Sequence, residues 1–287
     1  MLTVVVLQPF NATPTGIPAT AILMDTIPYA LDEPTNKFVL PKALREISGL
    51  SHFDDQQVAA IQDERGILYL LNAQTGEITR EIKFAGGGDY EGVEVAGDFL
   101  FVLRSDGDLF VFSADETTWL DRERARRIRT RLSSRCDAEG LALDRQRNHL
   151  LIACKEYPGR KMGKTRAVYS FDLETETVAP EPLLLLSAKL IREADKDSDV
   201  KYSRFKPSAL SVHPFTGQLY LISSPDRRLI VLDDDGTVTA TALLNKNLRQ
   251  PEGLTFLENG DLVIASEAAG KRPVLYTYAY QNSTDVE

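Results

Sequence analysis

Short apolar segments alternate with polar turns along most of this chain, and one four-residue motif recurs ahead of them. The motif places Ser or Glu, then Gly or Ala, before an aliphatic residue. Its second residues are 43, 48, 69 and 44 positions apart. A period of about 40–45 residues is typical of the four-stranded blade of a β-propeller. The five copies are Ile47-Ser48-Gly49-Leu50, Tyr90-Glu91-Gly92-Val93, Ala138-Glu139-Gly140-Leu141, Pro207-Ser208-Ala209-Leu210 and Pro251-Glu252-Gly253-Leu254.

Each motif opens the same series of predicted elements. A first strand begins at the motif, and a polar turn leads to a second, strongly apolar strand, for example residues 100–103 or 219–222. An acidic loop and a third strand follow, and a further turn leads to a fourth, more polar strand. Short strands separated by Gly, Asn and Asp turns are the pattern of all-β proteins. The sequence therefore predicts an all-β fold, a five-bladed β-propeller whose inner strands are the more apolar ones.

The last repeat contains only three strands before the chain ends. Residues 36–44, just ahead of the first motif, are able to supply the missing outer strand by pairing with residues 273–280. This pairing closes the ring and removes two free sheet edges. The alternative is a sixth blade built from residues 1–30. We expect an N-terminal extension at residues 1–27 and one propeller domain at residues 28–287.

The third repeat is longer than the others because of two insertions, at residues 157–166 and 180–207. Residues 183–199 in the second insertion have apolar positions at helical spacing, and we expect this helix outside the ring. Cys136 and Cys154 fall at strand ends of this repeat and are able to approach each other. From the sequence alone, a disulfide between them is the less favoured state.

The charge of the chain restricts its partners. The formal net charge is −9, so nucleic acid and anionic membrane surfaces are disfavoured, and cations or basic partners are favoured. Residues 122–135 hold seven arginines, which we interpret as a charged outer edge strand that resists edge-to-edge pairing. No apolar run approaches the ~20 residues of a transmembrane helix. We expect a monomer, cytoplasmic if the printed N-terminus is native, with a removed export segment as the alternative.

The alternating strand direction within a blade gathers acidic residues on one face of the ring. The start of the first strand and the loop after the second strand lie at the same end of an antiparallel blade. The first-strand starts supply Glu91, Glu139 and Glu252, with Ser48 and Ser208 at the equivalent positions. The same face receives residues from the positions just before these strands and from the loops after the second strands: Glu46, Asp63, Glu64, Asp89, Arg104, Asp106, Asp137, Lys155, Glu156, Asp226 and Glu267.

Three carboxylates at one channel mouth repel each other unless they are protonated, hydrated or bound to a cation. Oxygen ligands without Cys or His favour a hard ion such as Ca²⁺. We therefore expect Glu91, Glu139 and Glu252 to bind Ca²⁺. The alternative is that the Glu-Gly step only starts a strand, with backbone N–H groups holding the carboxylate. All three histidines, which are His52, His149 and His213, fall in or beside turns on the opposite face, where we expect surface residues and no catalytic base.

Several of these fragments, taken together and in this order, resemble the SdiA-regulated (YjiK-like) family, which is distantly similar to NHL-repeat propellers. The resemblance runs from about residue 31 to residue 280. It implies a five-bladed propeller with a calcium site, for which Glu91, Glu139 and Glu252 are the matching acidic positions. Members of the family often carry an N-terminal membrane anchor or export signal, which implies a location in the cell envelope. The fragments are Glu46-Ile-Ser-Gly-Leu-Ser51, Gln62-Asp-Glu-Arg-Gly66, Asp89-Tyr-Glu-Gly-Val93, Leu103-Arg-Ser-Asp-Gly107, Ala138-Glu-Gly-Leu141 and Ala153-Cys-Lys-Glu156.

Two classes of function are compatible with these features. The first is a calcium-binding module that holds a protein or small-molecule ligand at the acidic channel face, and we favour it because no histidine is expected there. The second is a calcium-dependent hydrolase of an ester, lactone or phosphoester. In that case the ion would polarise the substrate oxygen, and Asp63, Glu64 or Glu156 would be the base. Lys155 or Arg104 would then stabilise the developing anion.

Overall fold

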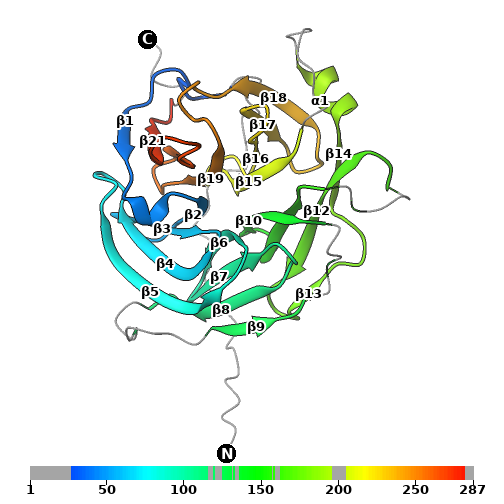
Figure 1. The fold of residues 1–287 in the computed structure, drawn as a ribbon. Coiled ribbons are helices and arrows are strands. Elements are labelled where there is room, and N and C mark those ends of the chain that lie inside the picture. The colour runs from blue at the N-terminus through cyan, green and yellow to red at the C-terminus, as the bar shows by residue number, and fades with distance from the viewer. Residues whose placement is uncertain are drawn as a thin grey trace, which may run out of the picture.

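The computed structural model describes residues 27–115, 119, 125–130, 132, 136–156, 158, 162–195 and 205–281. Within these ranges the chain forms five antiparallel sheets arranged around a central axis (Figure 1). Each sheet is one blade, and the strands of blades 1 to 4 run outward from the axis in chain order. The predicted all-β, five-bladed propeller is confirmed.

The blades share one plan, with the recurring motif on the innermost strand. The innermost strands are β2 (Ile47–His52), β6 (Tyr90–Ala96), β10 (Ala138–Asp144), β15 (Pro207–Val212) and β19 (Pro251–Phe256). The second strands are β3 (Gln57–Gln62), β7 (Phe99–Arg104), β11 (His149–Cys154), β16 (Leu219–Ser223) and β20 (Leu262–Ser266). The third strands are β4 (Arg65–Asn72), β8 (Leu109–Ser113), β12 (Thr165–Asp172), β17 (Arg228–Leu232) and β21 (Val274–Tyr278). The outer strands are β5 (Ile78–Gly87), β9 (Arg126–Ile128), β13 (Thr177–Val178) with β14 (Leu184–Ser187), β18 (Val238–Leu243) and β1 (Asn36–Val39).

The outer strand of the fifth blade comes from the other end of the chain. β1 pairs antiparallel with β21, from Asn36 opposite Thr277 to Val39 opposite Val274. The innermost strand β19 of this blade packs directly against β2 of the first blade. The predicted ring closure is therefore confirmed, and the six-bladed alternative is wrong.

The closing strand is shorter than predicted. It ends at Val39, and a 3-10 helix, η1 (Lys42–Leu44), occupies the rest of the predicted segment. Pro41 lies between the two and cannot donate a ladder hydrogen bond, which explains the early end of the strand. Residues 1–26 of the predicted extension lie outside the described residues.

The hydrophobic core lies between neighbouring blades rather than inside one compact centre. Along β3, for example, Val58 and Ala60 pack toward blade 5, whereas Ala59 and Ile61 pack toward blade 2. Five such buried clusters fill the five junctions between blades in the described part of the chain. Both faces of an inner strand are therefore buried, which explains its continuous apolar run.

The insertion in the third blade differs from the predicted single helix. Leu184–Ser187 forms β14, which pairs with Thr165–Val168 of β12, and only Ala188–Ala194 forms the helix α1. Pairing with β14 gives hydrogen-bond partners to the backbone groups at the outer edge of β12. Leu186 and Ile191 are buried in the junction with blade 4. Residues 196–199 of the predicted helix lie outside the described residues. Within the described ranges, no helix combines the length and apolar character needed to cross a membrane.

The arginine-rich stretch contributes an edge strand, as predicted, for the part that the structure describes. β9 pairs with β8 as the outer strand of blade 2. Arg126 pairs with Glu176 of the third blade, and Arg127 Nε donates to Asp108 Oδ2 at 2.6 Å. These arginines are therefore neutralised by carboxylates. Most of residues 116–124 and 131–135 lie outside the described ranges.

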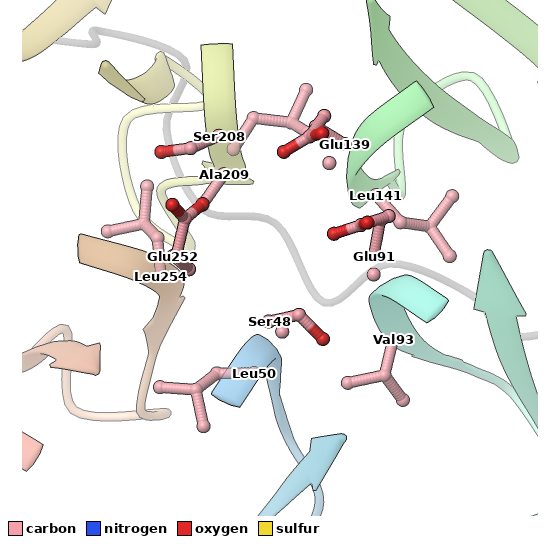
Figure 2. A pocket seen from close by; sticks show the side chains of 14 residues that line it. Ser48, Leu50, Glu91, Val93, Glu139, Leu141, Ser208, Ala209, Glu252 and Leu254 are labelled. Atoms are coloured by element: carbon pink, nitrogen blue, oxygen red, sulfur yellow. The ribbon is translucent and has the colours of Figure 1, made fainter. Parts of the chain in front are cut away.

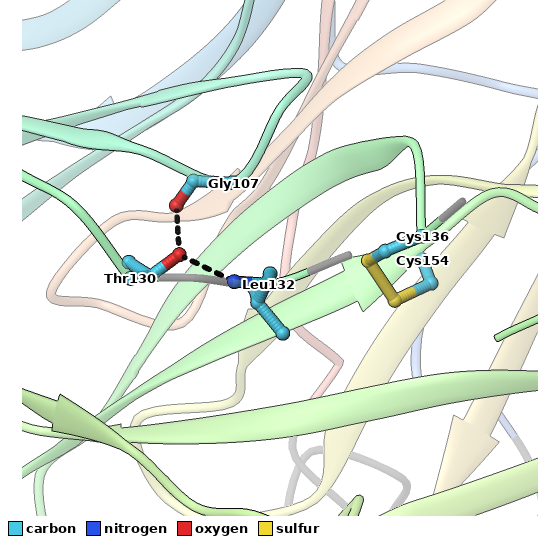
Figure 3. The surroundings of a disulfide bond; sticks show 5 residues. All are labelled: Gly107, Thr130, Leu132, Cys136 and Cys154. Carbon is cyan, nitrogen blue, oxygen red and sulfur yellow. Dashed lines mark hydrogen bonds between the residues drawn. A yellow bond between two sulfur atoms is a disulfide. The ribbon is translucent and has the colours of Figure 1, made fainter. Parts of the chain in front are cut away.

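Cys136 and Cys154 form a disulfide in the third blade (Figure 3), so the expectation of two unpaired cysteines is wrong. Both residues are buried. Lys155 N also donates to the carbonyl of Asp137 at 2.8 Å, and Glu156 N to that of Cys136 at 3.1 Å. The disulfide thus joins two segments that both lead to acidic-face residues.

Candidate functional site

A β-bulge at the start of each innermost strand aims one side chain at the central channel. In every blade the register between the first and second strands shifts at the same position of the motif. A bulge leaves one residue outside the ladder and redirects its side chain. The bulged residues line one narrow channel, as Figure 2 shows, and they are Ser48, Glu91, Glu139, Ser208 and Glu252.

In four of the five blades a glycine follows the bulged residue and allows the innermost strands to approach each other closely. A Cβ atom on Gly92 would lie 2.9 Å from the Cβ of Leu141 and 3.1 Å from its backbone N. Neither atom is the end of a flexible side chain. We therefore expect Gly92→Ala to lower the free energy of unfolding by about 1–3 kcal/mol through overpacking.

Urea unfolding of Gly92→Ala beside Gly86→Ala measures this effect. A Cβ on Gly86 meets no atom within 4 Å, so this control should stay within about 1 kcal/mol of the parent protein. Equal stability of the two variants would contradict the close approach of the innermost strands.

The serines and the glutamates of the channel differ in their partners. Ser48 Oγ donates to the carbonyl of Tyr90 at 2.6 Å, and Ser208 Oγ donates to that of Pro251 at 2.8 Å. Each serine thus ties its blade to the next one. Among the described residues, none of the three glutamates accepts a hydrogen bond from a backbone N–H. The geometry does not match the alternative in which backbone donors hold the glutamates at a strand start.

Burial and the charges of neighbouring carboxylates raise the pKa of all three channel glutamates. Burial, followed by the charges of Glu139 and Asp89, raises the pKa of Glu91 to about 10. Burial, with the charges of Glu139 and Glu267, raises the pKa of Glu252 to about 8. The channel therefore stores unfavourable electrostatic energy whenever these groups are ionised without a cation.

Lys155 offsets part of this repulsion. Its Nζ lies 2.5 Å from Oε1 of Glu139. Burial raises the pKa of Glu139 and Lys155 opposes that effect, so that the pKa of Glu139 is about 7. Burial alone would lower the pKa of Lys155, but the carboxylate of Glu139 outweighs burial and holds the pKa above its ordinary value. The predicted basic residue Lys155 is thus placed among the acids.

A second acidic group lies beside the channel, between blades 5 and 1. Burial, with the charges of Glu46 and Asp63, raises the pKa of Glu267 to about 7. Burial, with Glu46 and Glu64, also raises the pKa of Asp63. Oδ1 of Asp63 is fully buried and finds no hydrogen-bond donor among the described residues. A buried carboxylate oxygen without a donor has a high desolvation cost, which a cation would relieve.

The donor set suits a hard cation, although the side chains do not enclose one as they stand. The free space at the channel constriction is about 10 Å³, which is roughly the space of one water molecule. Within the described residues, no three His, Cys, Asp or Glu side chains are grouped closely enough to hold a metal ion. The chemistry of the oxygen donors fits Ca²⁺; ligation by Glu91, Glu139 and Glu252 requires their side chains to converge further.

Three other residues predicted for this face do not line the channel constriction. Arg104 forms a two-point pair with Asp106, with Nε–Oδ1 at 3.0 Å, and does not line the channel. Glu64 is exposed, and Glu156 pairs with Lys206. Of the three bases proposed for a hydrolase, Asp63 alone has a fully buried carboxylate oxygen that finds no hydrogen-bond donor within the described ranges, and its nearest charged neighbours are acidic.

A cavity next to the channel was not predicted from the sequence. This cavity, of about 280 Å³, lies where the ends of blades 3, 4 and 5 meet, and its lining includes Lys206, Ser224 and Arg249. Lys206 stands two residues before the bulged Ser208, the position that Glu46, Asp89 and Asp137 hold in blades 1 to 3. A comparison of this position across all the blades would have identified Lys206 from the sequence.

The histidines lie at the strand ends remote from the channel glutamates, but one of them is not a surface residue. His213 is 1% exposed and lies among the rings of Tyr29, Tyr220, Phe256 and Tyr280. Its Nδ1 accepts hydrogen bonds from two backbone N–H groups at 3.2 Å, so Nε2 carries the proton and donates to Tyr29 Oη at 3.0 Å. The expectation of a surface position is therefore wrong for His213, because the N-terminal segment covers it.

The order of these motifs along the blades is matched by a known family. A model of the family described as SdiA-regulated matches residues 30–271. The chain belongs to the SdiA-regulated family. The match includes every innermost strand and the whole acidic face and ends just before β21 of the fifth blade, which confirms the resemblance seen in the sequence. No curated protein matches the chain.

Solved structures support the fold of this SdiA-regulated protein and carry no argument about its activity. It is similar to the glutaminyl cyclase of Myxococcus xanthus, with a TM-score of 0.58 and 14% identity over 86% of this chain and 94% of the other. A protein of unknown function from Bacteroides thetaiotaomicron gives a TM-score of 0.50 and 15% identity over 82% of this chain and 56% of the other. A streptogramin B lyase gives a TM-score of 0.44 and 12% identity over 83% of this chain and 67% of the other, and this likeness carries no argument. With 1315 similar chains, the fold alone says little about chemistry.

Proposed function

We propose that the protein is a calcium-binding β-propeller of the cell envelope, which acts as a binding module for a protein or small-molecule ligand at the acidic face. One observation supports this most strongly. Three blades each direct one glutamate from a β-bulge into the same channel, and no backbone donor among the described residues holds these carboxylates. Glu139 and Glu252 are buried, and Glu91 is partly buried. Charged groups of one sign that are buried together require a counter-ion or protonation.

Glu91, Glu139 and Glu252 would be the protein ligands of the ion. When all three are ionised and Lys155 is charged, two negative charges remain, which a divalent cation neutralises. Bound Ca²⁺ would supply this compensation and would tie blades 2, 3 and 5 together at the axis. The rest of the acidic face would then be held in a fixed arrangement for the ligand.

Two features support the envelope. Cys136 and Cys154 form a buried disulfide, and disulfides persist mainly in oxidising compartments such as the periplasm or the cell surface. Members of the family often carry an export signal or a membrane anchor, which also favours a location in the cell envelope.

Calcium is expected to stabilise the fold through this site. At a concentration of about 100 times its dissociation constant, an ion that binds only the folded protein raises the free energy of unfolding by about 2.7 kcal/mol. Glu139→Gln should remove most of this gain, because it deletes one ligand charge and breaks the pair with Lys155. Thermal and urea unfolding of metal-depleted protein, with and without calcium chloride, measure the effect.

Glu258→Gln is the matched control, since Glu258 lies in the exposed turn between β19 and β20, at the opposite end of the blade. This variant should keep the full calcium response. An unchanged unfolding curve of the parent protein in chelator and in calcium would rule out the calcium site.

A calcium-dependent hydrolase is the second candidate, and the isolated buried oxygen of Asp63 is the observation that favours it. A base must lie within hydrogen-bond reach of its proton, directly or through one water. Asp63 is the described acid best placed for this role. Aryl esters, lactones and phosphoesters assayed with added calcium give the test. Turnover that disappears in Asp63→Asn, while the calcium response persists, would establish the hydrolase and displace the binding module.

A further inference from the structure

The acidic face is not acidic around the whole ring. The position two residues before the bulge is Glu46, Asp89 and Asp137 in blades 1 to 3, but Lys206 and Gln250 in blades 4 and 5. At this position the ring is therefore negative in three blades and neutral or positive in the other two, although Glu252 and Glu267 of blade 5 also lie on this face. This polarity divides the face into two binding environments.

The cavity of about 280 Å³ lies on the positive side. Its lining carries three cationic side chains, Lys155, Lys206 and Arg249, against the single carboxylate of Glu252. The chain as a whole has a net charge of −9, so the lining reverses the charge of the molecule. A concave site whose charge opposes that of the surrounding protein concentrates ligands of the opposite sign.

The three cations are not equally available. Lys155 pairs with Glu139, and Lys206 pairs with Glu156. Within the described part of the chain, the side chain of Arg249 makes no hydrogen bond or ion pair. It is exposed at the rim of the cavity. A guanidinium presents a planar fork of donors that matches a carboxylate or phosphate group. Arg249 is thus the cation that a ligand can reach without displacing a protein carboxylate.

We propose that this cavity binds the oxyanion group, carboxylate or phosphate, of a small molecule, with Arg249 and Lys206 as its charged contacts. Ser224 and Gln250 add uncharged polar groups to the lining. The volume lies near the lower end of the ~300–1,000 Å³ of small-molecule sites, which selects a compact ligand over a polymer. The inference names the ligand class of the proposed binding module and rests on that binding role, but not on calcium.

The cavity and the channel share two lining residues, Ser208 and Glu252. A ligand whose oxyanion lies against Arg249 therefore extends toward the channel glutamates. This position places the ligand at the boundary between the positive and negative sides of the face.

Calorimetric titration of metal-depleted protein with sodium succinate and with inorganic phosphate, at constant ionic strength and with sodium chloride as the reference, tests the proposal. We expect saturable binding of at least one of the two oxyanions. Binding of succinate alone assigns a carboxylate ligand, and binding of phosphate alone assigns a phosphate ester. Arg249→Gln and Lys206→Gln should each weaken that binding at least tenfold.

Lys246→Gln is the matched control, because Lys246 is exposed in the same loop as Arg249 but does not line the cavity. Its binding should equal that of the parent protein. Failure of both oxyanions to bind saturably, or equal binding by Arg249→Gln and Lys246→Gln, would overturn the proposal.

A separate titration with calcium chloride distinguishes this proposal from the calcium site. Arg249→Gln should keep the full calcium response while it loses oxyanion binding. If the parent protein gives no calcium response but binds an oxyanion through Arg249, the calcium site fails and the cavity site stands. If the parent protein responds to calcium and Arg249→Gln binds oxyanions as the parent does, the cavity site alone fails.

Discussion

Replacement of Cys136 and Cys154 together by serine is expected to lower the free energy of unfolding by about 3 kcal/mol. The disulfide closes a loop with a sequence separation of 18. A cross-link of this span lowers the conformational entropy of the unfolded chain, which corresponds to about 3 kcal/mol of stability. Both sulfur atoms are buried between strands that the backbone also joins. Denaturant unfolding of the double variant beside the parent protein measures the loss.

The reduced parent protein provides the control for this prediction. A reductant should destabilise the parent by a similar amount and leave the double variant unchanged. The calcium response should weaken in the reduced parent and in the double variant, because the disulfide holds Asp137 and Lys155 on either side of Glu139. Two titratable thiols in the unfolded, unreduced parent would show that the disulfide does not form.

His213 is expected to make stability depend on pH in the acid range. Burial lowers the pKa of His213 from 6.5 to about 4, so the folded protein keeps this ring neutral while the unfolded chain becomes protonated. Its contribution is fully present above pH 6.5 and is lost as the pH falls from 6.5 to 4. At about 1.4 kcal/mol for each pKa unit, the loss is about 3 kcal/mol.

The comparison of parent and His213→Asn isolates this effect, since the acids of the channel titrate in both proteins. Asn retains an oxygen able to accept from the backbone N–H groups of Phe215 and Thr216, but it does not titrate. The stability difference between the two proteins should shrink by about 3 kcal/mol between pH 6.5 and pH 4. His52→Asn, at a partly exposed histidine on the same face, is the matched substitution for comparison. A constant difference for His213→Asn would contradict the buried neutral ring.

The blades and their acidic face are predictable because they depend on local signals. A motif that repeats at blade spacing sets the start of each inner strand, and the antiparallel course of the chain then decides which loops share a face. Glu91, Glu139 and Glu252 follow from this reasoning without any knowledge of packing. The resemblance to the family rests on the same short fragments in order.

The features that the sequence does not reveal all depend on contacts between distant segments. Tyr29 buries His213 from 184 positions away. Leu184–Ser187 becomes a strand because the edge of β12 is open to it, although its four residues suit either a helix or a strand. The bulges arise from the pairing register of two strands, and the cavity beside Arg249 from the junction of three blades. The disulfide depends on the distance between two strand ends, which a count of two cysteines does not fix.

The pairing of β1 with β21 has a consequence for the time course of synthesis. Asn36 leaves the ribosome 241 residues (277 − 36) before its partner Thr277. At about 5–20 residues per second, the interval is roughly 12–50 s. During this time the first blade has no fifth blade to pack against, and the apolar junction that contains Leu50 and Leu71 stays open to water. The nascent protein therefore passes through a long-lived open form, and a chaperone that shields the edge of the first blade would act in that interval.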